Sequence, residues 1–523
     1  GQVEVSLTGP RLMSEHRAQF DTIVDMFDHD AGRWPERTAM ISGDQSLSYR
    51  AYRFAAGVLA ERLWDLGVGR GDRVAVFKGN SIGLSIAAQA IWAAGAQTVL
   101  FNPLYTAREL GPLLLDAAPA VLLCDDALMD LAAPLAAEAG ISALAFAADD
   151  LTSERGDEST DRPLPGPRPG PDDAASLVYT GGTTGLPKAA FHSHATTMAH
   201  VRMHDATWRL GEPGQTVLNV APQSHVWGLA MTLQSPLLGG ATIVNVPAFK
   251  PADVLEALVR HRVTVFTGGP STVYNALMGL PEIATADLGA LRRCFGGGAP
   301  FAEETVRAWH HLTGTTILEG YGMSEAGPIC GNSLDRPTRI GSVGLAMPGM
   351  ELEVVDIENG TQVLPPGEAG EIRVRGPNVI SHYWQRPEES AAAIRDGWLH
   401  TGDIGLVDAE GYVQIVDRKK DMAITGGYNV YPREIDEVLF AHPAVQEAAA
   451  VAVPDAHWGE VLQAYVVLLP GQTTDEEDLL AWCQARLAKY KIPARIEVAG
   501  ALPQTPANKI DKRALREQAQ AQG

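Results

Sequence analysis

Apolar residues in the first third of the chain repeat the pattern strand, helix, strand. Strand-like runs start residues 72–81 and 120–140, and residues 81–101 read as a buried helix that turns at Gly95 into a buried strand. These strands are too apolar to face water on either side, which is typical of a largely parallel sheet covered by helices. The pattern predicts an α/β fold built in layers.

The uncharged run 81–101 also has the roughly 20 residues that a membrane span needs. Polar residues interrupt it at Gln89, Gln97 and Thr98, which favours a buried helix and strand in a core over a membrane span. Residues 1–11 lack a basic segment followed by an apolar one, so we expect no export signal.

A second group of elements surrounds a loop rich in glycine and threonine. Residues 154–174 are charged and rich in proline and glycine, so we expect an exposed connector there. A strand at 176–180 then runs into the loop, and a helix is expected at 194–208. Short buried strands follow at 240–246, 263–268 and 315–322, with a helix at 251–261.

The sequence pattern changes after about residue 341, where apolar and polar residues alternate around turns as in antiparallel hairpins. From Asp421 a small α+β unit is expected: Pro432 opens a helix, two apolar strands follow, and Thr474 with Glu477 predicts a capping box for the next helix. We therefore predict a large N-terminal domain (1–419) of layered α/β subdomains plus a β-rich subdomain, and a small mobile C-terminal domain (420–523).

The charge of the chain restricts its ligands. A formal net charge of -22 over 523 residues argues against a nucleic-acid surface, so any phosphate ligand must meet a local site. The four cysteines lie far apart without a C-x-x-C pair, which favours a reducing compartment and a cytoplasmic location.

The loop at 179–188, with the sequence YTGGTTGLPK, combines backbone donors, hydroxyls and one ammonium group, as a phosphate cradle does. It is not a Walker loop, because Pro187 precedes Lys188 and Ala189 follows it. Taken alone, such a segment is as compatible with a plain turn as with a phosphate site.

Four more stretches, at 296–301, 319–325, 397–436 and 505–512, join this loop in sequence order. Together they resemble the adenylate-forming superfamily of acyl-CoA synthetases, firefly-type luciferases and peptide-synthetase adenylation domains. The resemblance extends from about residue 20 to 515. It implies an acid:CoA ligase that activates a carboxylic acid with ATP to an acyl-adenylate and transfers the acyl group to coenzyme A, with Mg²⁺ as the metal.

The resemblance also assigns the nucleotide site. Tyr321 would stack on adenine, Ser324 would donate to the α-phosphate, and Asp403 with Arg418 would hold the ribose. Glu325, with Thr184, would hold Mg²⁺. The remaining residues that match nucleotide-binding motifs are Thr180, Gly181, Gly182, Thr183, Gly185, Lys188, Gly298, Ala299, Pro300, Gly320 and Gly322.

Two lysines near the C-terminus carry the two-step scheme that the resemblance implies. Lys509 would bridge the carboxylate and the α-phosphate, and Lys420 would be the hinge about which the small domain rotates for thioester formation. That rotation would bring Gly426, Gly427 and Trp458 to coenzyme A. Tyr490 and Lys491 also resemble coenzyme A contacts, whereas Ile492 stands where some relatives have arginine.

The acyl pocket implied by the resemblance contains His225, Trp227, Gly296 and Gly297, with glycines that leave volume for the acid. The neighbouring stretch lacks the aspartate of amino-acid-activating relatives, so an uncharged, apolar acid is favoured. Residues 426–439 resemble fatty-acyl-CoA synthetases most, and bulky alicyclic or aromatic acids stay open as alternatives.

The sequence leaves several alternatives to this interpretation. His200 and His204 lie one helical turn apart, but without a further ligand nearby we expect no zinc there, and His194 is expected to be structural. The alternative acceptors are a carrier protein or oxygen, and a non-catalytic scaffold of the same fold is the alternative from another class. A homodimer is compatible with the sequence.

Overall fold

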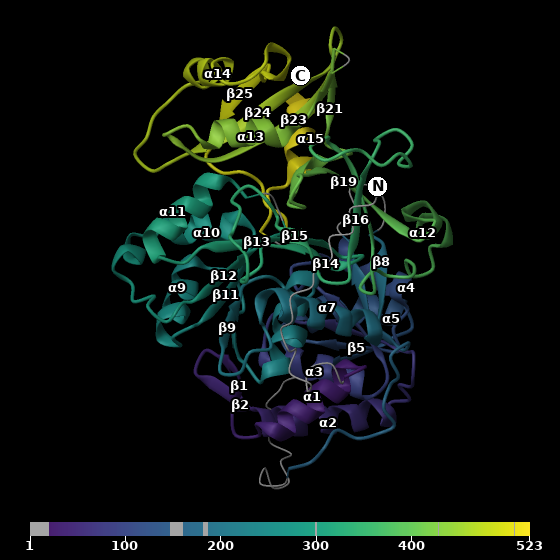
Figure 1. Ribbon diagram of the computed structural model, residues 1–523. Coiled ribbons are helices and arrows are strands. Elements are labelled where there is room, and N and C mark those ends of the chain that lie inside the picture. The colour runs from purple at the N-terminus through teal and green to yellow at the C-terminus, as the bar shows by residue number, and fades with distance from the viewer. Residues whose placement is uncertain are drawn as a thin grey trace.

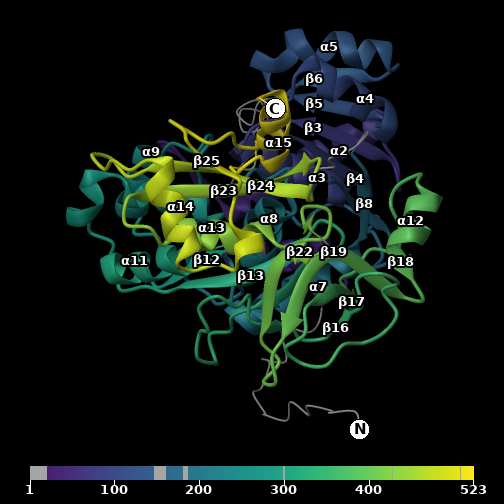
Figure 2. The same cartoon turned by 90° about the horizontal axis from the view of Figure 1, so that it is seen from above.

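A computed structural model describes residues 20–146, 161–180, 187–298, 301–426, 428–506 and 508–522. The chain forms a large N-terminal part and a smaller C-terminal part that rests on one end of it (Figure 1). The view from above shows the C-terminal strands and helices lying across that end (Figure 2). The predicted α/β class, with a large and a small domain, is confirmed.

The first large sheet has six strands in the order β6-β5-β3-β4-β7-β8. Three of them, β3, β4 and β5, are the parallel strands predicted from the apolar pattern, and β6, which was not predicted, pairs with β5 in parallel. β7 pairs with β4 in parallel and with β8 as an antiparallel hairpin. The strands are β3 (Arg73–Phe77), β4 (Gln97–Phe101), β5 (Val121–Cys124), β6 (Ser142–Ala145), β7 (Ala174–Tyr179) and β8 (Ala189–Ser193). The crossover helices are α3 (Ile82–Ala93), α4 (Ala107–Ala117) and α5 (Met129–Glu138).

The run 81–101 folds as predicted. All of α3 is buried, Gly95 has a φ of +81°, and the fully buried β4 follows. A left-handed φ suits glycine because it has no Cβ to clash. Across the described ranges of the chain, no helix combines the length and apolar character that membrane crossing requires.

The second large sheet has nine strands in the order β15-β14-β13-β12-β11-β9-β10-β1-β2. Its strands are β1 (Thr38–Ser42), β2 (Gln45–Ser48), β9 (Thr216–Asn219), β10 (Thr242–Asn245), β11 (Val265–Gly269), β12 (Arg293–Gly296), β13 (Ile317–Met323), β14 (Gly327–Gly331) and β15 (Leu345–Ala346). Three helices flank its β9–β13 half: α9 (Pro251–Arg260), α10 (Ser271–Met278) and α11 (Glu303–Thr313) (Figure 1).

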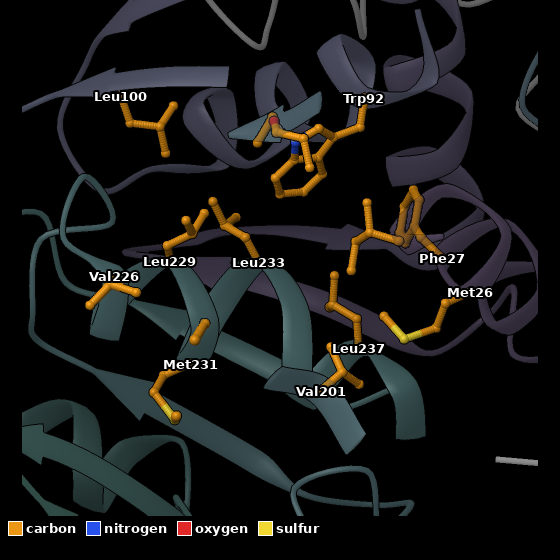
Figure 3. Close-up of a cluster of buried hydrophobic side chains, with 14 of the residues drawn as sticks. Met26, Phe27, Trp92, Leu100, Val201, Val226, Leu229, Met231, Leu233 and Leu237 are labelled. Carbon is orange, nitrogen blue, oxygen red and sulfur yellow. Dashed lines mark hydrogen bonds between the residues drawn. The ribbon is translucent and has the colours of Figure 1, made fainter. Parts of the chain in front are cut away.

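The main hydrophobic core lies between the two sheets. It combines α1 (Ile23–Arg33), α2 (Tyr49–Asp65), α3 and α7 (His194–Trp208) with the irregular helical segment 226–239. Figure 3 shows side chains from these elements, among them Phe27, Trp92, Leu233 and Leu237, pointing into one cluster. The shared core fixes the two sheets relative to each other.

The β-rich subdomain follows as predicted from the hairpin texture after residue 341. Its sheet has the order β16-β17-β19-β18, with β20 paired to β19, and all pairs are antiparallel. The bounds are β16 (Glu351–Val355), β17 (Gly370–Arg375), α12 (Pro387–Ala393), β18 (Ile394–Arg395), β19 (Trp398–Val407) and β20 (Val413–Arg418).

The C-terminal part is an α+β unit with its own apolar core. Its sheet has the order β22-β21-β24-β23, with β25 paired to β24. The bounds are β21 (Ala423–Thr425), β22 (Tyr428–Val430), α13 (Pro432–Phe440), β23 (Val445–Asp455), β24 (Gly459–Leu468), α14 (Glu476–Gln484), β25 (Arg495–Val498) and α15 (Lys512–Gln522). The domain boundary at Lys420 stays a prediction.

Two local expectations are wrong. The cap of α14 is Asp475, whose side chain accepts from the Asp478 N–H, while Thr474 donates to the Asp478 carboxylate; no capping box with Glu477 forms. Within the predicted connector, Leu164 is buried and its N–H donates to Asp28 at 2.7 Å, so the described part of that segment is attached to the core.

Replacing Trp92 with alanine should lower the free energy of unfolding by about 3–5 kcal/mol, because its fully buried ring leaves a cavity and its Nε1 bond to the Ala175 carbonyl is lost. Urea unfolding followed by circular dichroism measures this. Trp458→Ala is the matched control, since that ring is 51% exposed. Equal losses in the two variants would contradict this description of the core.

Candidate active site

The glycine- and threonine-rich loop is closed at its base by the β7–β8 hairpin. Tyr179 pairs with Ala189, and the Thr180 N–H donates to the Lys188 carbonyl at 2.8 Å. Thr180 and Lys188 therefore stand at the two ends of the loop. The predicted phosphate-binding residues between them, Gly181, Gly182, Thr183, Thr184 and Gly185, lie outside the described residues.

Lys188 points toward Glu325 across a tyrosine ring. Its Nζ lies 4.6 Å from the centroid of Tyr383, whose hydroxyl donates to Glu325 Oε1 at 2.7 Å. Burial raises the pKa of Glu325, while Tyr383 and Lys188 oppose that rise. Tyr383 was not predicted, because it lies outside every motif and is placed by an isolated bridge to Ala190 on β8.

The turn that carries Ser324 is held by a buried histidine. His192 on β8 donates from Nε2 to the Ser324 carbonyl at 2.7 Å, and burial lowers the pKa of His192 to about 4, so the ring is neutral. At the same turn a Cβ on Gly322 would lie 2.2 Å from the Gly327 carbonyl oxygen. The neighbouring His194, which is expected to be structural, is buried at the start of α7.

Tyr321, Asp403 and Arg418 form one cluster although they come from three strands. Asp403 on β19 pairs directly with Arg418 on β20, and the Arg418 Nε lies 3.4 Å from Asp403 Oδ1. The Tyr321 hydroxyl donates to Asp403 Oδ2 at 2.5 Å. Burial raises the pKa of Asp403, and the charge of Arg418 opposes this. The result is a buried carboxylate held in a fixed orientation.

Lys509 reaches this cluster from the C-terminal part. It lies in a turn closed by the Thr505 N–H bond to the Lys509 carbonyl, at 2.7 Å. A Cβ on Gly298, which has a φ of +79°, would lie 3.3 Å from Lys509 Cε. Burial and the nearby Arg418 lower the pKa of Lys509 to about 8, and Asp403 opposes them. The adjacent Ala299 and Pro300 lie outside the described residues.

A small apolar cavity of about 40 Å³ opens beside Gly298. Its described lining includes both predicted acyl-pocket side chains, His225 and Trp227, and contains no aspartate, glutamate, lysine or arginine. Trp208 and Met231, which belong to the buried core, also line it.

The predicted glycines of this pocket have different neighbours from those expected. A Cβ on Gly296 would lie 2.6 Å from the Phe301 ring, and one on Gly297 would lie 2.7 Å from the Gly320 carbonyl oxygen. Neither glycine lines the cavity, so both allow close packing of protein atoms; Gly320, in turn, permits Trp208 to pack against β13.

Two of the predicted coenzyme A residues lie together: Gly426 follows β21, and Trp458 lies in the turn between β23 and β24. The Gly426 N–H donates to the Trp458 carbonyl at 2.9 Å, and a Cβ on Gly426 would lie 2.9 Å from the Trp458 ring. Neither residue lines a cavity with Lys509. Gly427 lies outside the described residues, and Lys420 lines the cavity between the two parts of the chain.

His200 and His204 on α7 each have a protein partner. His200 Nε2 is 3.3 Å from the Asn378 carbonyl oxygen, and His204 Nδ1 is 2.9 Å from Ser235 Oγ. Among the described side chains, no group of three His, Cys, Asp or Glu is arranged to hold a metal ion.

Curated relatives match this chain over nearly its whole length. A long-chain-fatty-acid--CoA ligase of Bacillus subtilis (strain 168) is 35% identical, with 95% of this chain and 94% of the relative covered. A feruloyl-CoA synthase of an Amycolatopsis species is 37% identical, with 94% and 99% covered.

Solved structures agree with these relatives. ATP-bound MatB from Rhodopseudomonas palustris is 33% identical and superposes with a TM-score of 0.86, covering 95% of this chain and 98% of that one. The anthranilate CoA ligase AuaEII in complex with anthranoyl-AMP is 27% identical, with a TM-score of 0.87 and 95% and 97% covered.

Family models match both parts of the chain. The model described as AMP-binding enzyme matches residues 27–384, and the model described as AMP-binding enzyme C-terminal domain matches residues 434–509. The chain belongs to the AMP-binding enzyme family, the adenylate-forming enzymes that its five motifs resemble.

Proposed function

We propose that this protein is an acid:CoA ligase that converts an apolar carboxylic acid and ATP to an acyl-adenylate and then transfers the acyl group to coenzyme A. The observation that carries the proposal is that Lys509 lies near Asp403 and Arg418, beside an apolar cavity. The curated relatives named as CoA ligases support coenzyme A as the acceptor.

In the first half-reaction a carboxylate oxygen attacks the α-phosphorus of ATP, and the bond from that phosphorus to the pyrophosphate oxygen breaks. Both reactants are anions, so the protein contributes positive charge and alignment. Lys188 and the loop from Thr180 to Gly185 grip the pyrophosphate, and Ser324 donates to the α-phosphate. Lys509 neutralises the carboxylate and the α-phosphate as charge moves between them.

The nucleoside lies against β13 and β19. The Tyr321 ring stacks on adenine, and the backbone of Gly298, Gly320 and Gly322 approaches the nucleotide. The Asp403 carboxylate accepts hydrogen bonds from the ribose hydroxyls. Its burial and the hydrogen bond from Tyr321 hold this carboxylate in a fixed orientation. Arg418 supplies the second ribose contact. Ala299 and Pro300 belong to the same nucleotide-binding segment.

Glu325 would hold Mg²⁺ as a single carboxylate ligand, and Thr184, which lies outside the described residues, would add a hydroxyl ligand. Tyr383 donates to Oε1 alone, and Mg²⁺ in such sites takes few protein ligands beside phosphate oxygens and waters. When bound, the ion would neutralise charge on the phosphate oxygens. Tyr383 orients the carboxylate for this task.

The cavity lined by His225 and Trp227 receives the acyl group. About 40 Å³ of this cavity is open between the described residues. The lack of charged lining favours an uncharged acyl group, and the buried side chains of Trp208 and Met231 also line the cavity.

The second half-reaction needs a different arrangement of the C-terminal part. In our proposal rotation about Lys420 removes Lys509 and brings Gly426, Gly427 and Trp458 to the acyl-adenylate, where the thiolate of coenzyme A displaces AMP. The four buried, unpaired cysteines support a reducing, cytoplasmic compartment. A homodimer remains part of the proposal, to be tested by light scattering.

The test of the overall function is AMP release from a panel of butyrate, benzoate, ferulate, octanoate and palmitate, with and without coenzyme A. We expect AMP and thioester in equal amounts from each acid that the protein uses. Adenylate that reacts with a carrier protein and not with free coenzyme A would favour the alternative acceptor. No adenylate from any acid would refute the proposal.

Lys509→Ala should lower the rate of acyl-adenylate formation by about 100-fold or more, because one preorganised charge at the reacting centre is lost. Thioester formation from supplied acyl-adenylate should stay near the unmodified rate. Single-turnover assays of the two steps measure this, with the exposed Lys250→Ala as control. Equal loss of both steps would contradict the two-state scheme.

The pH dependence of the first step should follow Lys509. The pKa of this lysine in the closed site is lowered to about 8, so the amine is charged below that pH and neutral above it. We expect kcat/KM for ATP, which reports the free enzyme, to fall as pH rises through about 8. Thioester formation should rise over that range as the thiol ionises. A flat profile for the first step to pH 10 would contradict this role.

A further inference from the structure

Arg433, in the first turn of α13, fastens the C-terminal part to the N-terminal part. Its guanidinium donates to the carbonyl of Ile415, and a second amine lies 3.5 Å from the carbonyl oxygen of Phe301. Its backbone N–H donates to Asp417 Oδ2 at 2.9 Å. All three partners precede Lys420, so these bonds cross the proposed hinge. The Arg433 side chain is buried.

The charge of Arg433 is balanced from both sides of this junction. Glu437 on α13 lies 3.2 Å from its Nε. Glu319 on β13 is buried, and the charge of Arg433 opposes the effect of burial, which raises the pKa of Glu319 to about 7. Removal of the guanidinium would leave the buried Glu319 carboxyl group without a counter-charge, which disfavours the closed arrangement.

Helix α13 is in turn connected to the turn that carries Lys509. Lys512 Nζ at the start of α15 lies 2.7 Å from Asp436 Oδ2 on α13, and Lys512 follows Lys509 by three residues. Further along α15, Arg516 bonds to Asp421 at 2.6 Å. A contact that fixes α13 on the N-terminal part therefore also fixes Lys509.

Thr272 makes the second attachment, directly to that turn. It lies in α10 of the N-terminal part, is buried, and donates from its hydroxyl to the carbonyl of Asn508. Asn508 has a φ of +60°, a conformation that asparagine tolerates better than most residues. The bond holds the residue before Lys509 against α10.

The junction around these contacts is loosely filled. A cavity of about 300 Å³ separates the two parts, lined by Thr272, Phe301, Arg433, Asp436 and Lys512 among others. An interface with so much unfilled space gains little from apolar burial, so its closure depends on a few polar bonds. Such an interface can open and close within one catalytic cycle.

We propose that Arg433 and Thr272 are positioning residues for the first half-reaction, which hold the C-terminal part closed so that Lys509 stays beside Gly298, Asp403 and Arg418. This inference rests on the proposed two-step function. It predicts that their loss slows adenylation selectively, since thioester formation requires the same contacts to be broken.

The variants Arg433→Met and Thr272→Val remove the interdomain bonds while keeping similar side-chain volume. We expect adenylate formation to fall about 10- to 100-fold for Arg433→Met and about 3- to 10-fold for Thr272→Val, with thioester formation from supplied acyl-adenylate within about twofold of the unmodified protein. Arg433→Lys, which retains the charge, should lose less than Arg433→Met. The acid is the one of the panel above that is adenylated fastest.

Arg486→Met is the matched control, because this arginine stacks on the Trp482 ring and donates to the Trp482 carbonyl, both within the C-terminal part. Hydrogen exchange without any acid gives a second measurement: peptides from α10 and from residues 505–512 should exchange faster in Arg433→Met and Thr272→Val, but not in the control. Unchanged exchange, or equal losses in both half-reactions, would overturn the inference. Failure of the unmodified protein to form any thioester would count against the proposed function alone.

Discussion

The strongest constraint on this structure is electrostatic: a chain with a formal net charge of -22 must bring a carboxylate and a polyphosphate together. The fold meets this constraint by bringing a few positively charged side chains together from distant segments of the chain. Lys188 leaves the β7–β8 hairpin, Arg418 ends β20, and Lys509 enters from the C-terminal part. Each would be repelled by the others without a buried carboxylate nearby, and Glu325 and Asp403 provide that balance. The fold therefore concentrates positive charge at one site of a chain whose net charge is negative.

Buried hydrogen bonds hold this charge arrangement in register. Tyr383 orients Glu325, Tyr321 orients Asp403, and His192 holds the turn that carries Ser324. These donors are neutral, and two of them come from strands of different sheets. A preorganised polar site loses less free energy to reorganisation when charge develops in the reaction. The shared core between the sheets is what keeps such donors at fixed distances.

The junction with the C-terminal part follows a different principle. The N-terminal sheets are joined by a dense core, whereas the two parts meet around a cavity bridged by polar contacts. This contrast in packing suits the proposed two-step scheme, in which Lys509 is present for the first step and absent for the second. Dense packing keeps the two N-terminal sheets rigid relative to each other, and the few polar contacts at the junction allow the proposed rotation of the C-terminal part.

The sequence by itself determined the layered α/β class, the buried helix and strand at 81–101, the hairpin texture after residue 341 and the family, because periodicity and motifs are local properties of the chain. It also singled out Lys188, Glu325, Asp403, Arg418 and Lys509 through their motifs. Only the tertiary structure decided that Tyr383 and His192 support the site, that Gly296 makes room for Phe301 and that Arg433 crosses the junction. Those roles depend on contacts between residues tens to hundreds of positions apart, which no local pattern encodes.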